Sequence, residues 1–338
     1  MPLQPSLPPP YVLIAAIALT GLACRTRDAT PASSVVSSTP EEKALSFLAR
    51  EVPAWHRENH CFSCHNNGDG ARALYAAARQ GYPLARRALA DTSHWLQRPA
   101  QWEHNHGDPG FSDQRLARLQ FAMALLGGVE SGQLPDRAPR RALAEAARKV
   151  AADQAPDGSW QVEPSNPLGS PVTYGTALAT YAAWRLLEAA NLADLQEASR
   201  SALAWLQQLP PNNIPNAAVA LMTARRRPTG RQATSEASLA YLRRSQTRGG
   251  GWGPYPDAPA EPFDTALVIL ALTDTKAAPE EIEMLRRARR YLEGTQQSDG
   301  GWPATTRPPG GESYAQMIST TSWALLALLQ TPPRQLTD

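Results

Sequence analysis

The segment ENHCFSCHNNGDG, residues 58–70, concentrates the side chains of this chain that are best suited to metal or cofactor chemistry. It places Cys61 and Cys64 two residues apart and His65 directly after them. A Cys-x-x-Cys-His run is the attachment signature of c-type haem, in which two thioethers fix the porphyrin and the adjacent imidazole supplies the proximal iron ligand. The motif therefore predicts covalent haem c on Cys61 and Cys64, with His65 as the proximal ligand.

Two other kinds of site stay open for the same residues. Zinc could be held by both thiolates together with one or two imidazoles from His65, His104 and His106, because two sulfur and two nitrogen ligands complete a tetrahedral site. A disulfide between Cys61 and Cys64 is also open, although a two-residue gap makes such a bond strained and easily reduced.

Later segments of the chain repeat one another and indicate the architecture that must position this motif. Each has a Gln, then Gly residues, then a Trp, as in QAPDGSWQ (154–161), SQTRGGGWG (245–253) and TQQSDGGWP (295–303). The gap between the first two tryptophans is about twice the gap between the last two. A degenerate copy is therefore expected between them, at residues 202–216.

The segments that flank these turns read as alternating outer and inner helices. An amphipathic segment with a charged face precedes each turn, and an Ala/Leu-rich segment that is apolar nearly all round follows it. The first kind suits a surface and the second a buried layer. Extending the template gives six helix pairs, which begin near Glu41, Leu84, Pro139, Gln196, Thr234 and Glu281. The predicted fold is all-α, an α/α toroid over residues 41–330 with a tail at 331–338, because closing the ring leaves no exposed end pair.

These turns resemble the QW repeats of the squalene–hopene cyclase and prenyltransferase superfamily, and the resemblance implies the same α/α toroid. The superfamily cyclises or transfers isoprenoids. The Asp-x-Asp-Asp motif that supplies the proton donor in the cyclases is absent from this sequence, and a prenyltransferase-type zinc site would have to use Cys61 and Cys64. A terpenoid cyclase-like or prenyltransferase-like enzyme, or a lipid-binding protein that holds a hydrophobic small molecule in the toroid cavity, is therefore an alternative function.

The haem-type motif occupies the place where later repeats carry Gly-Gly-Trp, so it is the turn of the first helix pair. The turn of the second pair is QWEHNHGDPG, residues 101–110. Neighbouring turns lie side by side at one end of such a ring. His104 or His106 is therefore the expected distal ligand, with exposed loop histidines as the alternative interpretation.

The starts of the inner helices are a further place where a ligand could be held. Helix N-termini present unpaired N–H groups and a positive dipole end, which could accommodate haem propionates or another anionic group. Tyr174, Asp264 and Tyr314 stand near these starts and are candidates for the cavity mouth. Their alternative roles are helix caps and rim packing, since Asp before an apolar helix is a preferred N-cap.

The N-terminus predicts export. Residues 1–24 read as a signal peptide with an uncharged apolar run at 11–23, and the sequence TGLAC ending at Cys24 resembles a bacterial lipobox, in which the cysteine is lipidated. Residues 25–40 are rich in Ser, Thr and Pro and read as a flexible linker. The expected location is the periplasm or the outer membrane, with the chain held at the membrane by a lipid.

The composition of the chain supports a folded protein and gives no support to nucleic-acid binding. The 338 residues are 42% hydrophobic, which supports a sizeable core, and 33 basic against 31 acidic residues give a net charge of +2 and no electrostatic case for nucleic acid. The predicted role is electron transfer or redox sensing at the cell envelope with a redox partner protein. A zinc-stapled interaction scaffold is the other alternative beside the cavity enzyme.

Overall fold

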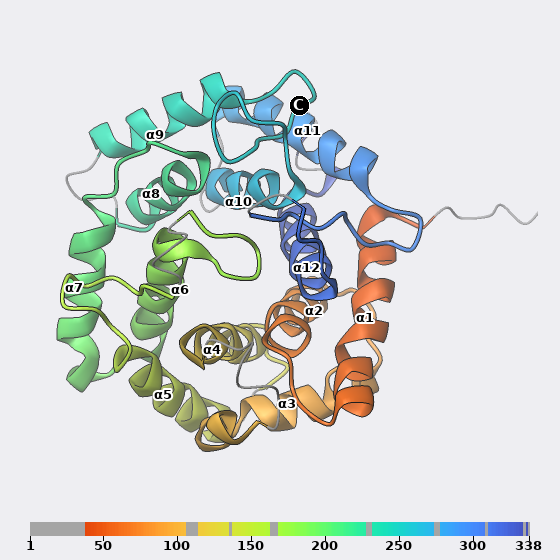
Figure 1. Ribbon diagram of the computed structural model, residues 1–338, viewed down its shortest axis with the longest axis vertical. Helices are drawn as coiled ribbons and strands as arrows, with labels where there is room; N and C mark the ends of the chain where they lie inside the picture. Colours follow the sequence, from red (N-terminus) through yellow and green to blue (C-terminus); the bar gives the residue numbers. More distant parts are fainter. Residues whose placement is uncertain are drawn as a thin grey trace, which may run out of the picture. The chain divides into compact units, whose positions relative to one another are not determined.

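The computed structural model describes residues 38–105, 114–134, 137–162, 168–227, 232–273, 278–307, 310–333 and 336. Within these residues, six helix pairs form a ring, as predicted (Figure 1). The outer helices are α1 (Pro40–Asn59), α3 (Ala90–Leu96), α5 (Arg137–Ala151), α7 (Gln196–Leu206), α9 (Gln232–Ser245) and α11 (Pro279–Thr295). The inner helices are α2 (Ala71–Arg79), α4 (Gln114–Glu130), α6 (Gly175–Ala190), α8 (Ile214–Arg226), α10 (Pro262–Thr273) and α12 (Tyr314–Gln330). Short helical turns stand at η1 (Cys64–Gly70), η2 (Arg86–Ala88), η3 (Pro99–His104) and η4 (Ala193–Leu195).

The two helix layers follow from their residue patterns. In α12 every residue from Ile318 to Leu329 is buried, and in α10 the buried run from Pro262 to Ile269 is unbroken. Such helices are stable only when neighbours cover all sides. The outer α5 instead buries one stripe and leaves its arginines toward solvent. The apolar layer therefore lies at the centre of the ring.

The Gln–Gly–Trp turns owe their recurrence to a shared set of hydrogen bonds. In each, the indole N–H donates over 2.8 Å to the carbonyl ten residues earlier, which pairs Trp160 with Val150, Trp252 with Leu242 and Trp302 with Leu292. The glycine two residues before each tryptophan has a positive φ, between 92° and 96°. A Cβ on Gly300 would lie only 2.4 Å from the carbonyl oxygen of Lys43, so both the backbone conformation and the space require glycine there.

The glutamine of each turn joins consecutive outer helices. Its amide donates over 2.9 Å to a carbonyl near the start of the next outer helix, from Gln154 to Ala198, from Gln246 to Met284 and from Gln296 to Pro40. The last of these bonds joins the end of α11 to the start of α1 and closes the ring. A buried ion pair between Arg289 and Glu41, at 2.7 Å, reinforces the same junction.

Candidate functional site

The first turn departs from the Gln–Gly–Trp pattern and forms the π-helical segment η1. Ser63 caps this segment, because its hydroxyl accepts from the backbone N–H groups of His65 and Asn66. Cys61 and Cys64 are partly exposed and are not joined in a disulfide. His65 extends toward α12, where its Nδ1 lies 3.2 Å from Ser319 Oγ, while its Nε2 lies 3.5 Å from Cys64 Sγ.

Two asparagines in η1 hold the turn in place. Asn67 donates to the carbonyl of Val52 on α1 at 3.1 Å and to the hydroxyl of Thr92 on α3 at 2.9 Å. Asn66 donates to Tyr314 Oη on α12 at 2.8 Å. Both asparagine side chains are fully buried, so they replace the glutamine and tryptophan of the later turns as links between neighbouring helices.

Asp69 is the centre of a buried polar network in the middle of the ring. Its side chain is only 2% exposed. Oδ2 accepts from Gln120 of α4 and from Ser319 of α12, each at 2.8 Å, and Oδ1 accepts a short hydrogen bond from the hydroxyl of Tyr174. Burial raises the pKa of Asp69 to about 6, and the three donors and the nearby Arg72 only partly oppose this rise.

The network assigns the proton positions on His65. The single hydroxyl proton of Ser319 is donated to Asp69, so toward His65 the Ser319 oxygen acts as an acceptor. We therefore assign the ring proton to Nδ1. Burial lowers the pKa of His65 to about 4, which keeps the ring neutral near pH 7 and leaves a lone pair on Nε2, facing Cys64.

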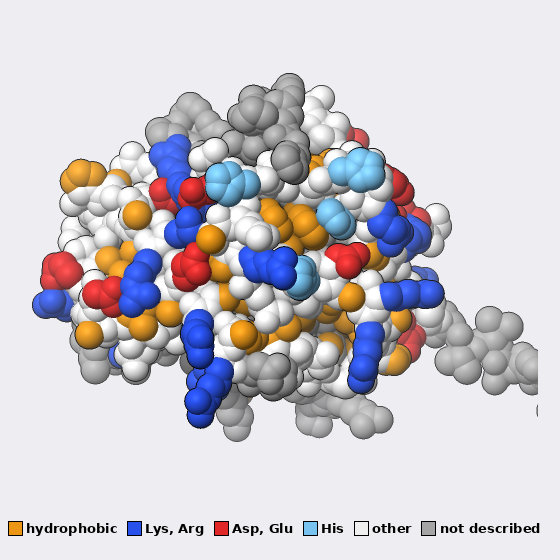
Figure 2. All heavy atoms as spheres, turned by 90° about the horizontal axis from the view of Figure 1, so that it is seen from below, with side chains coloured by type: hydrophobic (Ala, Val, Ile, Leu, Met, Phe, Trp, Pro, Cys, Tyr) orange, Lys and Arg blue, Asp and Glu red, His pale blue; other side chains and the backbone are white. Residues whose placement is uncertain are grey.

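The turn of the second repeat lies directly beside the first. Asn105 accepts from the backbone N–H of Phe62 at 2.8 Å and donates to its carbonyl at 2.6 Å. The ring of Phe62 stacks between His56, at 4.0 Å, and Trp95, at 4.5 Å between centroids. Figure 2 shows histidine side chains gathered around hydrophobic surface on the side of the molecule that carries α3.

Only one of the two predicted distal ligands, His104, lies in the described part of the chain. His104 is exposed at the end of η3, next to the residue that pairs with Phe62. His106 lies outside the described residues, as does Cys24 with the whole segment 1–37. Within the described part of the chain, no three His, Cys, Asp or Glu side chains are grouped as a metal site would require. Over the same residues, no helix is both long and apolar enough to span a membrane.

The three residues predicted at the cavity mouth lie in different surroundings. Tyr174 is 1% exposed and donates to Asp69. Asp264 is fully buried in an ion pair with Arg307, and burial raises its pKa above the usual carboxyl range despite that partner. Tyr314 is 37% exposed and donates to Glu51 over 2.8 Å.

A central cavity of about 560 Å³ lies between the inner helices and extends toward their C-terminal ends. All six inner helices contribute to its wall, and none of the three mouth candidates does. Its apolar wall consists of Ala76, Met123, Leu126, Leu178, Ala182, Met222, Leu270, Trp323 and Leu326. The cavity therefore opens toward the end of the ring opposite the turns.

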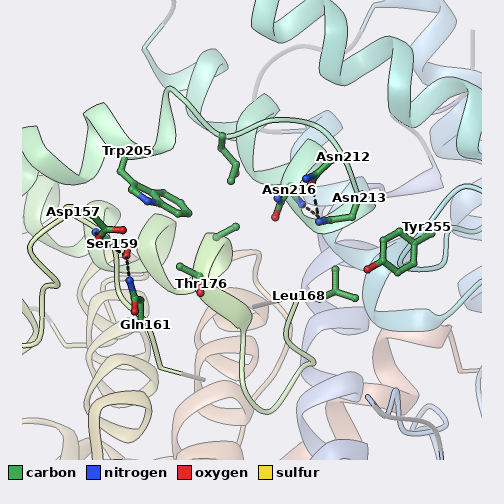
Figure 3. Close-up of a pocket in the computed structure, with 12 residues that line it drawn as sticks. Asp157, Ser159, Gln161, Leu168, Thr176, Trp205, Asn212, Asn213, Asn216 and Tyr255 are labelled. Atoms are coloured by element: carbon green, nitrogen blue, oxygen red, sulfur yellow. Dashed lines mark hydrogen bonds between the residues drawn. The ribbon is translucent and has the colours of Figure 1, made fainter. Parts of the chain in front are cut away.

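A second cavity, of about 460 Å³, lies at the turn end near the starts of α6 and α8 (Figure 3). It stands beside the degenerate fourth turn, which has no Gly-Trp pair. Asn213 caps α8 there, and both Asn213 and Asn216 donate over 3.0 Å to Asn212, so these amides largely satisfy one another. Trp205 extends into the space between them and Asp157.

Comparison with known proteins supports the fold. Residues 206–336 match the family described as the squalene-hopene cyclase C-terminal domain. The type II terpene cyclase MstE from Scytonema is 16% identical, with a TM-score of 0.52 over 87% of this chain and 97% of that one. A variant of MstE in complex with geranylgeranyl dihydroxybenzoate is 15% identical, with a TM-score of 0.50 over the same shares.

A second kind of protein has the same architecture. A possible member of the GH105 family from Salmonella enterica is 12% identical, with a TM-score of 0.50 over 87% of this chain and 94% of that one. No curated protein matches the chain. At these identities the structural matches show the α/α toroid, and the family model matches only the C-terminal part of the chain.

Several residues of the site have no counterpart in the sequence analysis. Asp69 lies four residues after the Cys-x-x-Cys-His motif, and its partner Ser319 lies 250 positions away in the sequence. The arginines of the central cavity were equally unexpected. Their sequence signal is a basic residue in or near the last turn of an otherwise apolar inner helix, as at Arg79 and Arg226.

Proposed function

We propose that the central cavity holds a hydrophobic small molecule of the isoprenoid or lipid type. The observation that carries this proposal is the cavity of about 560 Å³, to whose wall all six inner helices contribute apolar side chains. Its size is within the range of ligand pockets, and apolar walls bury a hydrocarbon chain favourably. The MstE complex supports the proposal, because geranylgeranyl dihydroxybenzoate is the substrate of that protein, which has a similar fold.

The carboxylates near the cavity favour ligand binding over proton-initiated cyclisation as its function, because none of them is a suitable proton donor. Among the described residues that line the cavity, the only carboxylate is Glu130, which pairs with Arg185. Burial raises the pKa of Asp69 to about 6, which makes it a weaker acid, its oxygens are taken by three protein donors, and it does not line the cavity. A proton donor to an alkene must reach the ligand.

The test uses a neutral fluorescent probe, N-phenyl-1-naphthylamine, and its displacement by farnesol. Ala76→Phe places a ring in the cavity and should weaken probe binding at least tenfold, whereas Ala237→Phe on the exposed face of α9 should leave it unchanged. Leu326→Trp is the second variant if Ala76→Phe fails to fold. Absence of probe binding and of co-purified lipid in the wild type would refute the proposal.

A second candidate function is covalent haem at the first turn, in electron transfer or redox sensing at the cell envelope. The assignment of the His65 proton to Nδ1 favours it, because a metal-ligating histidine characteristically donates its other ring N–H to an oxygen of the protein. Cys61 and Cys64 would hold the porphyrin, His65 Nε2 would ligate the iron, and the haem would supply one-electron chemistry.

The haem test is a pyridine haemochrome spectrum of protein expressed with c-type maturation machinery. Wild type should give the c-type spectrum and the Cys61→Ala/Cys64→Ala variant should not. His104→Ala and His106→Ala, measured separately, should alter the spectrum only for the true distal ligand. A colourless wild type with about one zinc per chain would favour the zinc-stapled scaffold.

A further inference from the structure

The cavity at the turn end of the ring differs in chemical character from the central cavity. It holds about 460 Å³ and shares no described lining residue with the central one. Its wall comes from the third turn (154–161), the fourth turn (202–216), the segment after the fifth turn and the starts of α6 and α8 (Figure 3). Among the described lining residues there is no Lys, Arg or His, while four are Asn or Gln. The cavity is therefore rich in amides and poor in charge.

The place of this cavity in the fold is a local departure from the repeat. In the complete turns the tryptophan fills the space between the outer and inner helices, and Trp160, Trp252 and Trp302 are at most 2% exposed. The fourth turn has no such tryptophan, and the cavity lies beside it. The packing that is repeated elsewhere therefore leaves room here for another molecule.

Two aromatic side chains line the cavity. Trp205 stands near the end of α7, in the position that Tyr291 occupies in α11. The hydroxyl of Tyr291 donates to the carbonyl of Ala260 at 2.7 Å, so that ring is packed within its own repeat. Trp205 is half-buried and lines the cavity instead, and Tyr255, which is 51% exposed, lies on the opposite side of it in Figure 3. The cavity thus has aromatic surface on two sides.

The asparagines of the fourth turn are held in fixed orientations. Asn212 Oδ1 accepts from the Nδ2 of Asn213 and from the Nδ2 of Asn216, each at 3.0 Å. Asn213 Oδ1 caps α8 by accepting from the backbone N–H of Asn216 at 2.9 Å. Within the described part of the chain, these bonds leave the Nδ2 of Asn212 and the Oδ1 of Asn216 without a partner. One donor and one acceptor are therefore oriented in the cavity wall before any ligand binds.

The single carboxylate in the wall belongs to the turn itself. Asp157 Oδ1 accepts from the backbone N–H and the hydroxyl of Ser159, at 3.0 and 2.7 Å. In the last turn Asp299 Oδ1 accepts from the backbone N–H of Gly301 in the same way, at 2.9 Å. Because this acid recurs where its role is to hold the turn, it is not evidence of a site for a cation. The wall thus favours an uncharged ligand.

We infer that this cavity binds a neutral saccharide, with one pyranose ring packed against Trp205 and its hydroxyls hydrogen-bonded to Asn212 and Asn216. The C–H face of a pyranose is attracted to the electron-rich face of an indole. Each hydroxyl both donates and accepts, so neighbouring hydroxyls match an amide oxygen and an amide nitrogen. A hydrocarbon would leave these amides without partners. This inference is independent of the function proposed for the central cavity.

Saturation-transfer difference NMR tests the inference with four probes, methyl β-glucoside, methyl β-galactoside, methyl α-mannoside and N-acetylglucosamine. At least one should bind the wild type with a Kd of about 1–10 mM, the strength of one packed ring and a few neutral hydrogen bonds. Saturation should be strongest on the ring C–H protons, because these face the indole. Trp205→Leu should weaken binding by about tenfold or more, whereas Trp205→Tyr should retain most of it.

The amides are tested separately. Asn212→Ala and Asn216→Ala should each weaken binding by about threefold to tenfold, the value of one neutral hydrogen bond. Gln208→Ala is the matched control, because this exposed amide lies in the same turn and does not line the cavity. Circular dichroism checks the fold of every variant. If Trp205→Leu fails to fold, Tyr255→Ala replaces it, since that side chain is exposed.

Four outcomes would overturn the inference. The first is that none of the four saccharides binds the wild type. The second is that binding is unchanged in both Trp205→Leu and Asn212→Ala, which would place the saccharide elsewhere. The third is that tetramethylammonium binds this cavity in preference to every saccharide. The fourth is that Ala76→Phe, in the central cavity, abolishes saccharide binding. None of the first three affects the proposal for the central cavity.

Discussion

The ring junction at Gly300 permits a stability prediction with an internal control. Gly300 lies in the last Gln–Gly–Trp turn with a φ of 96°, directly against the backbone of Lys43 at the start of α1. Gly294 lies six positions earlier, within α11, and a Cβ there would meet nothing within 4 Å. The same substitution, Gly→Ala, should therefore have opposite effects at the two positions.

The magnitudes follow from the geometry. At Gly300 a left-handed conformation costs an alanine about 1–2 kcal/mol, and the new Cβ would lie 2.4 Å from the Lys43 carbonyl oxygen, where ordinary contact begins at 3.4 Å. Relieving that overlap costs about 1–3 kcal/mol more. Gly300→Ala should thus lower the free energy of unfolding by about 2–5 kcal/mol. Gly294→Ala should raise it by about 1 kcal/mol, because alanine is the better helix former.

Urea unfolding followed by far-UV circular dichroism measures both variants against the wild type. Gly158→Ala and Gly250→Ala test the same reasoning at the equivalent turns, where a Cβ would meet the carbonyl oxygens of Ser201 at 2.6 Å and Arg287 at 2.4 Å. A loss below about 1 kcal/mol for Gly300→Ala would show that the turn relaxes freely. The ring closure described above would then not depend on that close approach.

Three further predictions concern the buried acid, the ring junction and the N-terminus. Because the pKa of Asp69 is raised from 3.8 to about 6, the folded state keeps a proton that the unfolded state loses, and this group lowers the free energy of unfolding by about 3 kcal/mol as the pH rises from about 4 through about 6. Denaturant titration across that window should show that the difference in free energy of unfolding between wild type and Asp69→Asn changes by this amount. A difference that stays constant with pH would contradict the raised pKa of Asp69. Arg289→Met should cost about 3–5 kcal/mol because it leaves Glu41 buried without its partner, and the paired Arg289→Met/Glu41→Gln variant should recover much of the loss. Cys24→Ser should remove a lipid mass from the mature protein in intact mass spectrometry and release the chain from membranes, and an unlipidated wild type would refute the lipobox interpretation.

The helix pairs were predictable because their signal is local. A tryptophan that bonds ten residues back, and a glycine that alone fits its turn, leave their identities in each copy of the sequence. The fourth turn has neither, yet spacing alone located it correctly at residues 202–216, where α7 gives way to α8. Repetition thus compensates for a missing motif.

The interior of the site was not predictable, because its contacts join residues that are far apart in the sequence. Asp69 meets Tyr174 and Ser319 across 105 and 250 positions, and only ring closure brings those helices together. The Asn-Asn pair directly follows the Cys-x-x-Cys-His motif, and in the fold both asparagines join the turn to its neighbouring helices. A sequence motif for attachment chemistry thus overlaps residues that the architecture itself needs.

The glutamine links between outer helices bear on how the chain can be assembled. Each joins the end of one outer helix to the start of the next, and Gln296 makes the same bond to Pro40 that Gln154 and Gln246 make to their own successors. Three junctions carry this link, and the one at Gln296 joins the last outer helix to the first. The ring can therefore close only after the final turn has been synthesised, so its first and last helices depend on each other although they are farthest apart in the sequence.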